Sequence, residues 1–103
     1  MIHVIATIEL AEESREEFVS IFRNNIPKVK AEKGCMSYTP TIDVDSGIPI
    51  QDPLRDNAVT IIETWESLEA LHAHLKAPHM AEYREAVKNL VKKLSLQVFE
   101  PAA

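Results

Sequence analysis

The sequence predicts an α+β domain in which strands and helices follow in the order β-α-β-β-α-β, with an antiparallel sheet. Three observations support this prediction. Four short segments alternate between apolar and polar residues or are rich in β-branched residues, as strands are. Two longer segments repeat apolar residues at three- and four-residue steps, as helices do. The 103 residues are the length of one domain, so we expect a single domain over residues 1–103.

The first strand and the first helix are expected in the first third of the chain. Residues 2–10 alternate as a strand, with apolar side chains on one face and a mixed second face that includes Thr7. A helix is predicted for residues 12–33, because this segment has an acidic start, a basic end and an apolar stripe. Pro27 is expected to kink or interrupt the helix. Gly34 is placed to end it in a left-handed conformation.

Two further strands are predicted on either side of a long loop. Residues 35–44 form the second strand, and residues 58–65 form a third one that is rich in Val, Ile and Thr. The segment between them, residues 45–57, contains Gly, Pro and Asp residues that are typical of loops. This loop is longer than a tight hairpin needs, and loops of such length usually have a function or are mobile.

The second helix is expected in two pieces. Ser67 is placed as the N-cap of a short helix that runs to about Lys76. Pro78 fits the first turn of a second helical piece. The apolar stripe of that piece consists of Met80, Tyr83, Val87, Leu90, Val91 and Leu94. Residues 95–100 then form a short fourth strand.

Elements in this order form the ferredoxin-like split βαβ arrangement, in which the helices cover one face of the sheet. The other face is left bare. It is predicted to contain enough Ile, Val, Met or Phe that its exposure to water is unfavourable. Pairing of two copies through this face is the simplest way to cover it, so we expect a homodimer.

The charge of the chain argues against nucleic-acid and membrane partners. The formal net charge is -5 with a pI near 5.3, and no run of Lys or Arg exceeds two residues. Nucleic acids and anionic membrane surfaces require a basic patch. The N-terminus does not have the pattern of a signal peptide, and no apolar run approaches the ~20 residues of a membrane span. The single cysteine, Cys35, excludes an internal disulfide, which fits a cytoplasmic protein.

Three histidines lie close together in the sequence, at His72, His74 and His79. Residues two apart on a helix point away from each other. No carboxylate or cysteine completes a helical pair of ligands in the manner of H-E-x-x-H. We therefore expect no metal site.

Residues 63–80 carry a pattern with several fixed spacings. It consists of Glu63-Thr64-Trp65-Glu66-Ser67, then Leu71, Ala73-His74-Leu75 and Ala77-Pro78-His79-Met80. With Gly34-Cys35 ahead of the second strand, this pattern resembles the antibiotic biosynthesis monooxygenase domain family, including its small quinol monooxygenases. The resemblance covers nearly the whole chain. It implies a dimeric α/β barrel that oxidises quinols or aromatic polyketides with dioxygen and without metal, flavin or haem.

In the chemistry that the resemblance implies, the substrate supplies the electrons, and the protein deprotonates it and excludes water. That requires a closed apolar pocket with a few polar groups. The loop at residues 45–57 is longer than in many compact members, so substrate assignments do not carry over. Other members degrade haem with an asparagine in the first strand, and Thr7 at that position disfavours haem. A non-catalytic dimeric module that binds a small aromatic ligand or a protein partner is the alternative, since no nucleophile or phosphate loop is evident.

His74 is the candidate general base, because the pKa of histidine lies near neutrality. The alternative is a half-buried histidine that bonds to the backbone. A helical wheel places His72, rather than His74, closer to the centre of the Leu68-Leu71-Leu75 stripe, whereas the family pattern favours His74. His72 and His79 are candidate substrate-binding residues, although His79 equally fits a helix cap.

Glu63 is a second catalytic candidate. It shares a strand face with Val59, Ile61 and Trp65, and that face should be buried. A buried carboxylate needs a partner, or its pKa rises. We expect an ion pair with Arg84 or with the dimer mate, and a role as a base is the alternative. Trp65 is a candidate wall of an aromatic pocket, or a core residue whose N–H finds one partner.

The remaining candidates carry hydroxyl groups. Tyr83, on the apolar stripe of the last helix, is a catalytic candidate, and Tyr38, on the second strand, is a substrate-binding candidate. Either tyrosine could instead be a core residue. Thr7 is the last of the substrate-binding candidates.

Overall fold

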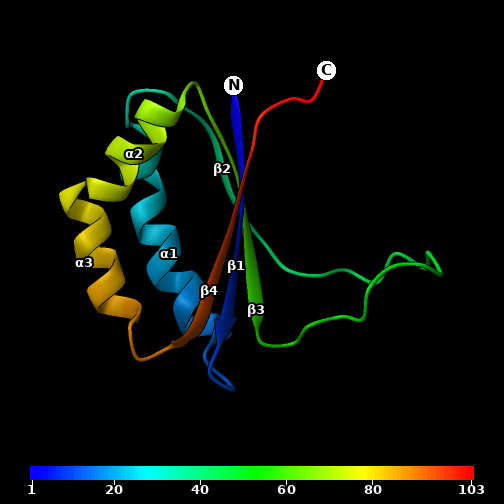
Figure 1. Ribbon diagram of the computed structural model, residues 1–103. Helices are drawn as coiled ribbons and strands as arrows, with labels where there is room; N and C mark the ends of the chain where they lie inside the picture. Colours follow the sequence, from blue (N-terminus) through cyan, green and yellow to red (C-terminus); the bar gives the residue numbers. More distant parts are fainter.

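A computed structural model describes all residues from 1 to 103, and it contains the predicted order of strands and helices (Figure 1). The second helix is divided in two, as expected. The elements are β1 Ile2–Leu10, α1 Arg15–Lys30, β2 Cys35–Thr41, β3 Ala58–Trp65, α2 Leu68–Lys76, α3 Pro78–Val87 and β4 Val91–Phe99. The four strands form one antiparallel sheet in the order β2-β3-β1-β4, and the three helices lie on one side of it. The predicted α+β fold class is confirmed.

The central strand β1 defines the two sides of the sheet. Its alternate residues from Ile2 to Leu10 are all buried and face the helices. Cross-strand partners share a side, so Glu63, which is opposite Val4, also lies on this helix side. The intervening residues of β1, including Thr7, lie on the other side, which no helix covers. This second side is called the bare side below.

The bare side is less apolar than the sequence predicted. Its large apolar side chains are Ile5, Ile62 and Phe99, and they alternate with hydroxyl and amide side chains. The polar neighbours are His3, Thr7, Ser37, Thr39, Thr41, Thr60, Thr64, Ser95 and Gln97, and Glu9 and Lys93 add charges of opposite sign at one end of this side. The exposed Leu94, Leu96 and Val98 of β4 lie on the helix side instead, opposite Ile8, Ala6 and Val4.

The helix α1 runs unbroken through Pro27, so this proline does not interrupt it. The helix begins three residues later than predicted, because the backbone first makes a turn in which the N–H of Ser14 donates to the carbonyl of Ala11. Gly34 follows with a φ of 87°, which confirms its predicted left-handed conformation. A Cβ at Gly34 would lie 2.6 Å from the Cβ of Ala70, so glycine is also required by the close approach of α2.

The last helix ends at Val87, and β4 begins at Val91 rather than at the predicted residue 95. Leu90 and Val91 lie four and three residues before Leu94, a spacing that fits a continued helical stripe. In the structure, the N–H of Leu90 bonds to the carbonyl of Val87, and its own carbonyl accepts from Ala11. The chain therefore turns and pairs with the whole length of β1, which places Leu94 opposite Ile8. Strand pairing overrides the local pattern here.

The strand β2 ends at Thr41, three residues earlier than predicted, and residues 42–57 form an arm that extends away from the sheet and helices (Figure 1). The guanidinium of Arg55 donates to both carboxylate oxygens of Asp43 at 2.9 and 2.8 Å. These hydrogen bonds lower the pKa of Asp43 to about 2. Several large apolar residues of the arm are exposed, with Ile50 91% accessible. They are Ile42, Val44, Ile48, Ile50 and Leu54.

None of the three helices combines the length and the apolar character that crossing a bilayer requires.

Candidate active site

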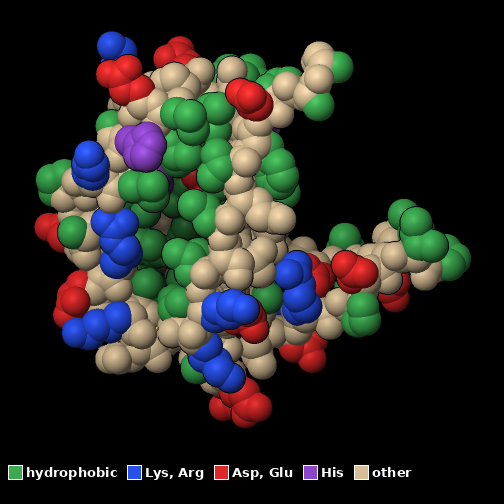
Figure 2. Space-filling model, in the orientation of Figure 1, with side chains coloured by type: hydrophobic (Ala, Val, Ile, Leu, Met, Phe, Trp, Pro, Cys, Tyr) green, Lys and Arg blue, Asp and Glu red, His purple; other side chains and the backbone are tan.

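A cleft of about 330 Å³ lies between the helix side of the sheet and the helices α2 and α3. Twelve of its sixteen lining residues are hydrophobic, so the interior is mostly apolar. Figure 2 shows the hollow, lined by hydrophobic side chains, between the helical layer and β4. Its volume is at the lower end of the range for small-molecule sites and suits a ligand of one or two rings.

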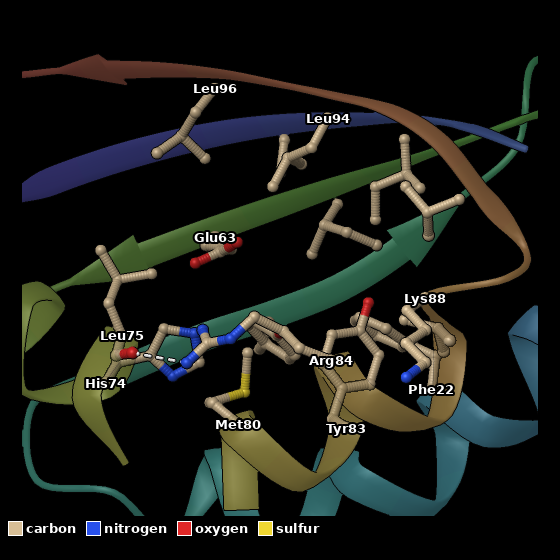
Figure 3. A pocket seen from close by; sticks show the side chains of 16 residues that line it. Phe22, Glu63, His74, Leu75, Met80, Tyr83, Arg84, Lys88, Leu94 and Leu96 are labelled. Carbon is tan, nitrogen blue, oxygen red and sulfur yellow. Dashed lines mark hydrogen bonds between the residues drawn. The ribbon is translucent and has the colours of Figure 1, made fainter. Parts of the chain in front are cut away.

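Glu63 carries a carboxyl group into this apolar space from β3 (Figure 3). The side chain is only 5% exposed, and Trp65 Nε1–H donates to its Oε1 at 2.9 Å. Burial raises the pKa of Glu63 to about 7, although the hydrogen bond from Trp65 acts in the opposite direction. The carboxyl group therefore changes its protonation state near neutral pH.

The predicted ion pair between Glu63 and Arg84 is absent. The Arg84 guanidinium donates instead to the backbone carbonyl of Leu75, at the C-terminal end of α2, over 2.9 Å (Figure 3). An unpaired helix-terminal carbonyl is a favourable acceptor for a cation, and this one is close to the side chain of Arg84. The partner of Glu63 is Trp65 instead. Its N–H is a neutral donor, so it satisfies the carboxyl group without adding a second buried charge.

His74 lines the cleft from the helical side and is 2% exposed. Its ring lies against Trp65, with the ring centroids 4.6 Å apart, and edge-on to Tyr38 at 5.5 Å. Nδ1 lies 2.8 Å from Oε2 of Glu32, and Nε2 makes no hydrogen bond within the chain. Burial lowers the pKa of His74, and the nearby Glu32 carboxylate opposes that shift. A neutral imidazole that lines the cleft and has one nitrogen without a hydrogen bond can accept a proton.

The helical wheel was wrong about which histidine points inward. In α2 the buried residues are Leu71 and His74, while Leu68, His72 and Leu75 are exposed. Leucine spacing therefore did not mark the core face of this helix. The family pattern selected His74, and the structure places that residue in the cleft.

Both tyrosine candidates line the cleft, and the rings of both pack against the ring of Phe22. The Tyr38 ring stacks on Phe22 at 5.3 Å between centroids, and Tyr83 approaches the same ring edge-on at 5.8 Å. Burial raises the pKa of both phenols, so they remain protonated at neutral pH. Neither hydroxyl is used in a hydrogen bond within the chain, which leaves both free to donate to a ligand.

Four predicted substrate-binding residues do not line the cleft. Thr7 is on the bare side of the sheet, opposite Thr60 and Ser95, and His72 is on the outer surface of α2. Trp65 is fully buried and contacts two lining residues, Glu63 through a hydrogen bond and His74 through its ring. His79 lies outside the lining but is 3.1 Å from Oε2 of Glu32.

Sequence reasoning missed Glu32 and the position of Lys88 at the cleft, and it considered Arg84 only as an ion-pair partner of Glu63. Glu32 lies between α1 and β2 and contacts two histidines that are more than forty positions away in the sequence. No local pattern in the sequence therefore indicates its role. Arg84 and Lys88 are four residues apart and border the cleft at α3. Such a pair on a helix end usually indicates a solvated face. No group of three or more His, Cys, Asp or Glu side chains is arranged to hold a metal ion.

The sheet order and the one-sided helices define a small ferredoxin-like domain, and its open apolar cleft has the volume of a small-molecule site. The chain belongs to the antibiotic biosynthesis monooxygenase family, whose description, "Antibiotic biosynthesis monooxygenase", matches residues 1–86. It is 37% identical over 103 residues to the Escherichia coli K12 protein named "Probable quinol monooxygenase YgiN". That match covers 98% of each chain.

Solved structures share the fold at lower sequence identity. PA3566 from Pseudomonas aeruginosa has a TM-score of 0.80 and 22% identity, and the match covers 99% of this chain and 94% of that one. A protein from Nitrosomonas europaea has a TM-score of 0.82 and 15% identity, with all of both chains covered. These likenesses show that the fold is shared.

Proposed function

We propose that the protein is a monooxygenase that oxidises a small quinol or related phenol with dioxygen and without a cofactor. The observation that carries this proposal is His74, a buried imidazole that lines an apolar cleft of about 330 Å³ and whose Nε2 makes no hydrogen bond within the chain. Membership of the family and the 37% identity to a relative named for quinol oxidation support the choice of substrate class.

The proposed reaction balances without a further reductant. A hydroquinone with a free ring carbon and one dioxygen molecule give a hydroxyquinone and water. Oxidation of the two ring hydroxyls supplies two electrons, and conversion of the ring C–H to C–O supplies two more. One oxygen atom enters the ring, and the other leaves as water.

The cleft offers a role for each polar group. His74 Nε2 takes the proton of a substrate hydroxyl, because the resulting phenolate gives up an electron to dioxygen more readily than the phenol does. Glu63, whose pKa is about 7, donates a hydrogen bond to a second substrate oxygen when it is protonated. Tyr38 and Tyr83 provide two further hydroxyl donors, and the hydrophobic walls offer a surface from which a bound ring displaces water.

We further propose that the working form is a homodimer that pairs through the bare sides of two sheets. Ile62 is 47% exposed there, and Phe99 is also exposed. The arm at residues 42–57 adds further exposed apolar side chains. Exposed apolar surface of this kind is characteristic of interfaces.

Oxygen uptake by chelator-treated protein, with a panel of hydroquinones, tests the catalytic proposal. We expect turnover above the protein-free rate, and a loss on the order of 10²- to 10⁴-fold in His74→Ala, as for removal of a general base. Lys76→Ala, at an exposed position of the same helix, is the matched control and should retain the wild-type rate. Rates equal to the blank across the panel, with saturable ligand binding, would instead indicate a non-catalytic binding module.

A further inference from the structure

Glu32 links the end of α1 to the two consecutive helices α2 and α3. It follows α1, and its backbone is fixed by an N–H bond to the Val29 carbonyl and by its own carbonyl, which accepts from Cys35. One oxygen of its carboxylate, Oε2, lies 2.8 Å from Nδ1 of His74 in α2 and 3.1 Å from Nε2 of His79 in α3. The carboxylate side chain is 15% exposed, so these contacts are largely shielded from water.

We propose that Glu32 is a positioning residue that holds His74 with its proton on Nδ1 and its bare Nε2 toward the cleft. The inference deepens the proposed function and rests on it. A carboxylate only accepts hydrogen bonds, so the histidine nitrogen that faces it must carry a proton. A neutral imidazole has one N–H, so the other nitrogen is left as an acceptor. Without Glu32, His74 is free to carry its proton on Nε2, where it cannot serve as a base.

The same carboxylate also stabilises the state that forms after proton transfer. When His74 takes a proton from the substrate, its ring becomes an imidazolium, and the negative charge 2.8 Å away favours that cation. Of the other titratable or charged groups around His74, His79 and Arg84 on α3 oppose the cation. Tyr38 and Glu63 face His74 from the sheet side of the cleft. Glu32 is therefore the contacting group that holds His74 in the required tautomer before the proton transfer and stabilises its imidazolium afterwards.

Glu32→Gln tests this role, because glutamine keeps the shape and removes the charge. We expect kcat for a turned-over hydroquinone to fall on the order of 10²-fold or more. The acidic limb of the rate profile should move to lower pH, because the charge that raises the pKa of His74 is gone. Combining Glu32→Gln with His74→Ala should cost no more than His74→Ala alone, since the two residues act as one unit. Glu66→Gln, which neutralises an exposed carboxylate near Gly34, is the matched control and should leave both kcat and the pH profile unchanged.

A second readout does not depend on turnover. The ¹⁵N shifts of the His74 ring, measured by NMR in the wild-type protein, should show the Nδ1–H tautomer, and Glu32→Gln should show a larger share of Nε2–H. This pattern would support the inference even if no quinol were oxidised, in which case only the proposed function would fail. A wild-type ring with its proton on Nε2, or an unchanged pH profile in an active Glu32→Gln enzyme, would overturn the inference.

Discussion

Ile62 and Glu63 are neighbours in β3, and each occupies surroundings that would suit the other. Ile62 lies on the bare side of the sheet with 47% of its surface exposed, whereas Glu63 is 5% exposed between the sheet and the helices. A fold optimised only for stability would place apolar residues inside and charged residues outside. The reversal at two adjacent positions indicates that each side of the sheet has a task beyond folding. On one side we propose a partner, and on the other side a substrate.

Ile62→Asp should give the largest effect, because it places a charge in the proposed dimer interface. If two bare sides pack together, each protomer would bury a carboxylate that has no counter-charge, at a cost of about 3–5 kcal/mol per charge. The dimer dissociation constant should then rise by more than about 10³-fold. Sedimentation at micromolar concentration would show a dimer for the wild-type protein and a monomer for Ile62→Asp.

Ala81→Glu is the control for that experiment, since Ala81 is exposed on α3, away from the bare side. It adds the same charge and should remain a dimer. A monomeric wild-type protein, or a dimer that survives Ile62→Asp, would remove the proposed interface. Ile62 would then remain exposed to water in the functional protein.

Glu63→Gln should give the next largest effect, on the pH dependence of stability. The folded protein holds the pKa of Glu63 at about 7, above the ordinary 4.5, so the folded state binds more protons between these values. The stability of the wild-type protein should therefore decline as pH rises from about 4.5 to about 7, by about 3 kcal/mol in total. Glutamine stays neutral and still accepts from Trp65, so the variant should not show this decline.

Urea unfolding at a fixed protein concentration, from pH 4.5 to 8, measures the effect as a difference between the two proteins. The other titrating groups are the same in both and largely cancel. The advantage of Glu63→Gln should be small at pH 4.5 and reach its maximum above pH 7. If the difference in unfolding free energy between the two proteins stayed constant across this range, Glu63 would ionise as it does in water. Glu63 would then not be a misplaced charge, and its contrast with Ile62 would be withdrawn.

The fold could be predicted from the sequence because its signals are local. Alternation in β1, the break at Pro78 and the left-handed Gly34 all follow from neighbouring residues. The error at Leu94 shows the limit of such signals. Apolar residues three or four positions apart, as in this segment, also fit a helix. Only the pairing of β4 with β1 shows that the segment is a strand.

The site was only partly predictable, because it is made by contacts between distant segments. Alternation alone showed that Glu63 is buried, but not that Trp65 rather than Arg84 bonds to it. Helical periodicity favoured His72, and a family pattern was needed to select His74. Glu32 gave no signal at all, since its partner is 42 positions away and becomes a neighbour only after α1 and α2 have packed on the sheet.

Thr39→Val should give the smallest effect and would sharpen the contrast between the two sides. Thr39 is exposed on the bare side and is the strand partner of Ile62. In a dimer closed through that side, the substitution exchanges a hydroxyl for a methyl group beside an apolar neighbour. It should strengthen the dimer by less than about 1 kcal/mol, which is the value of one buried methylene. Sedimentation equilibrium at several concentrations measures the change as a dissociation constant that falls by up to about fivefold. A constant that rises instead would show that the Thr39 hydroxyl bonds across the interface, so that the threonines of the bare side would be part of its specificity.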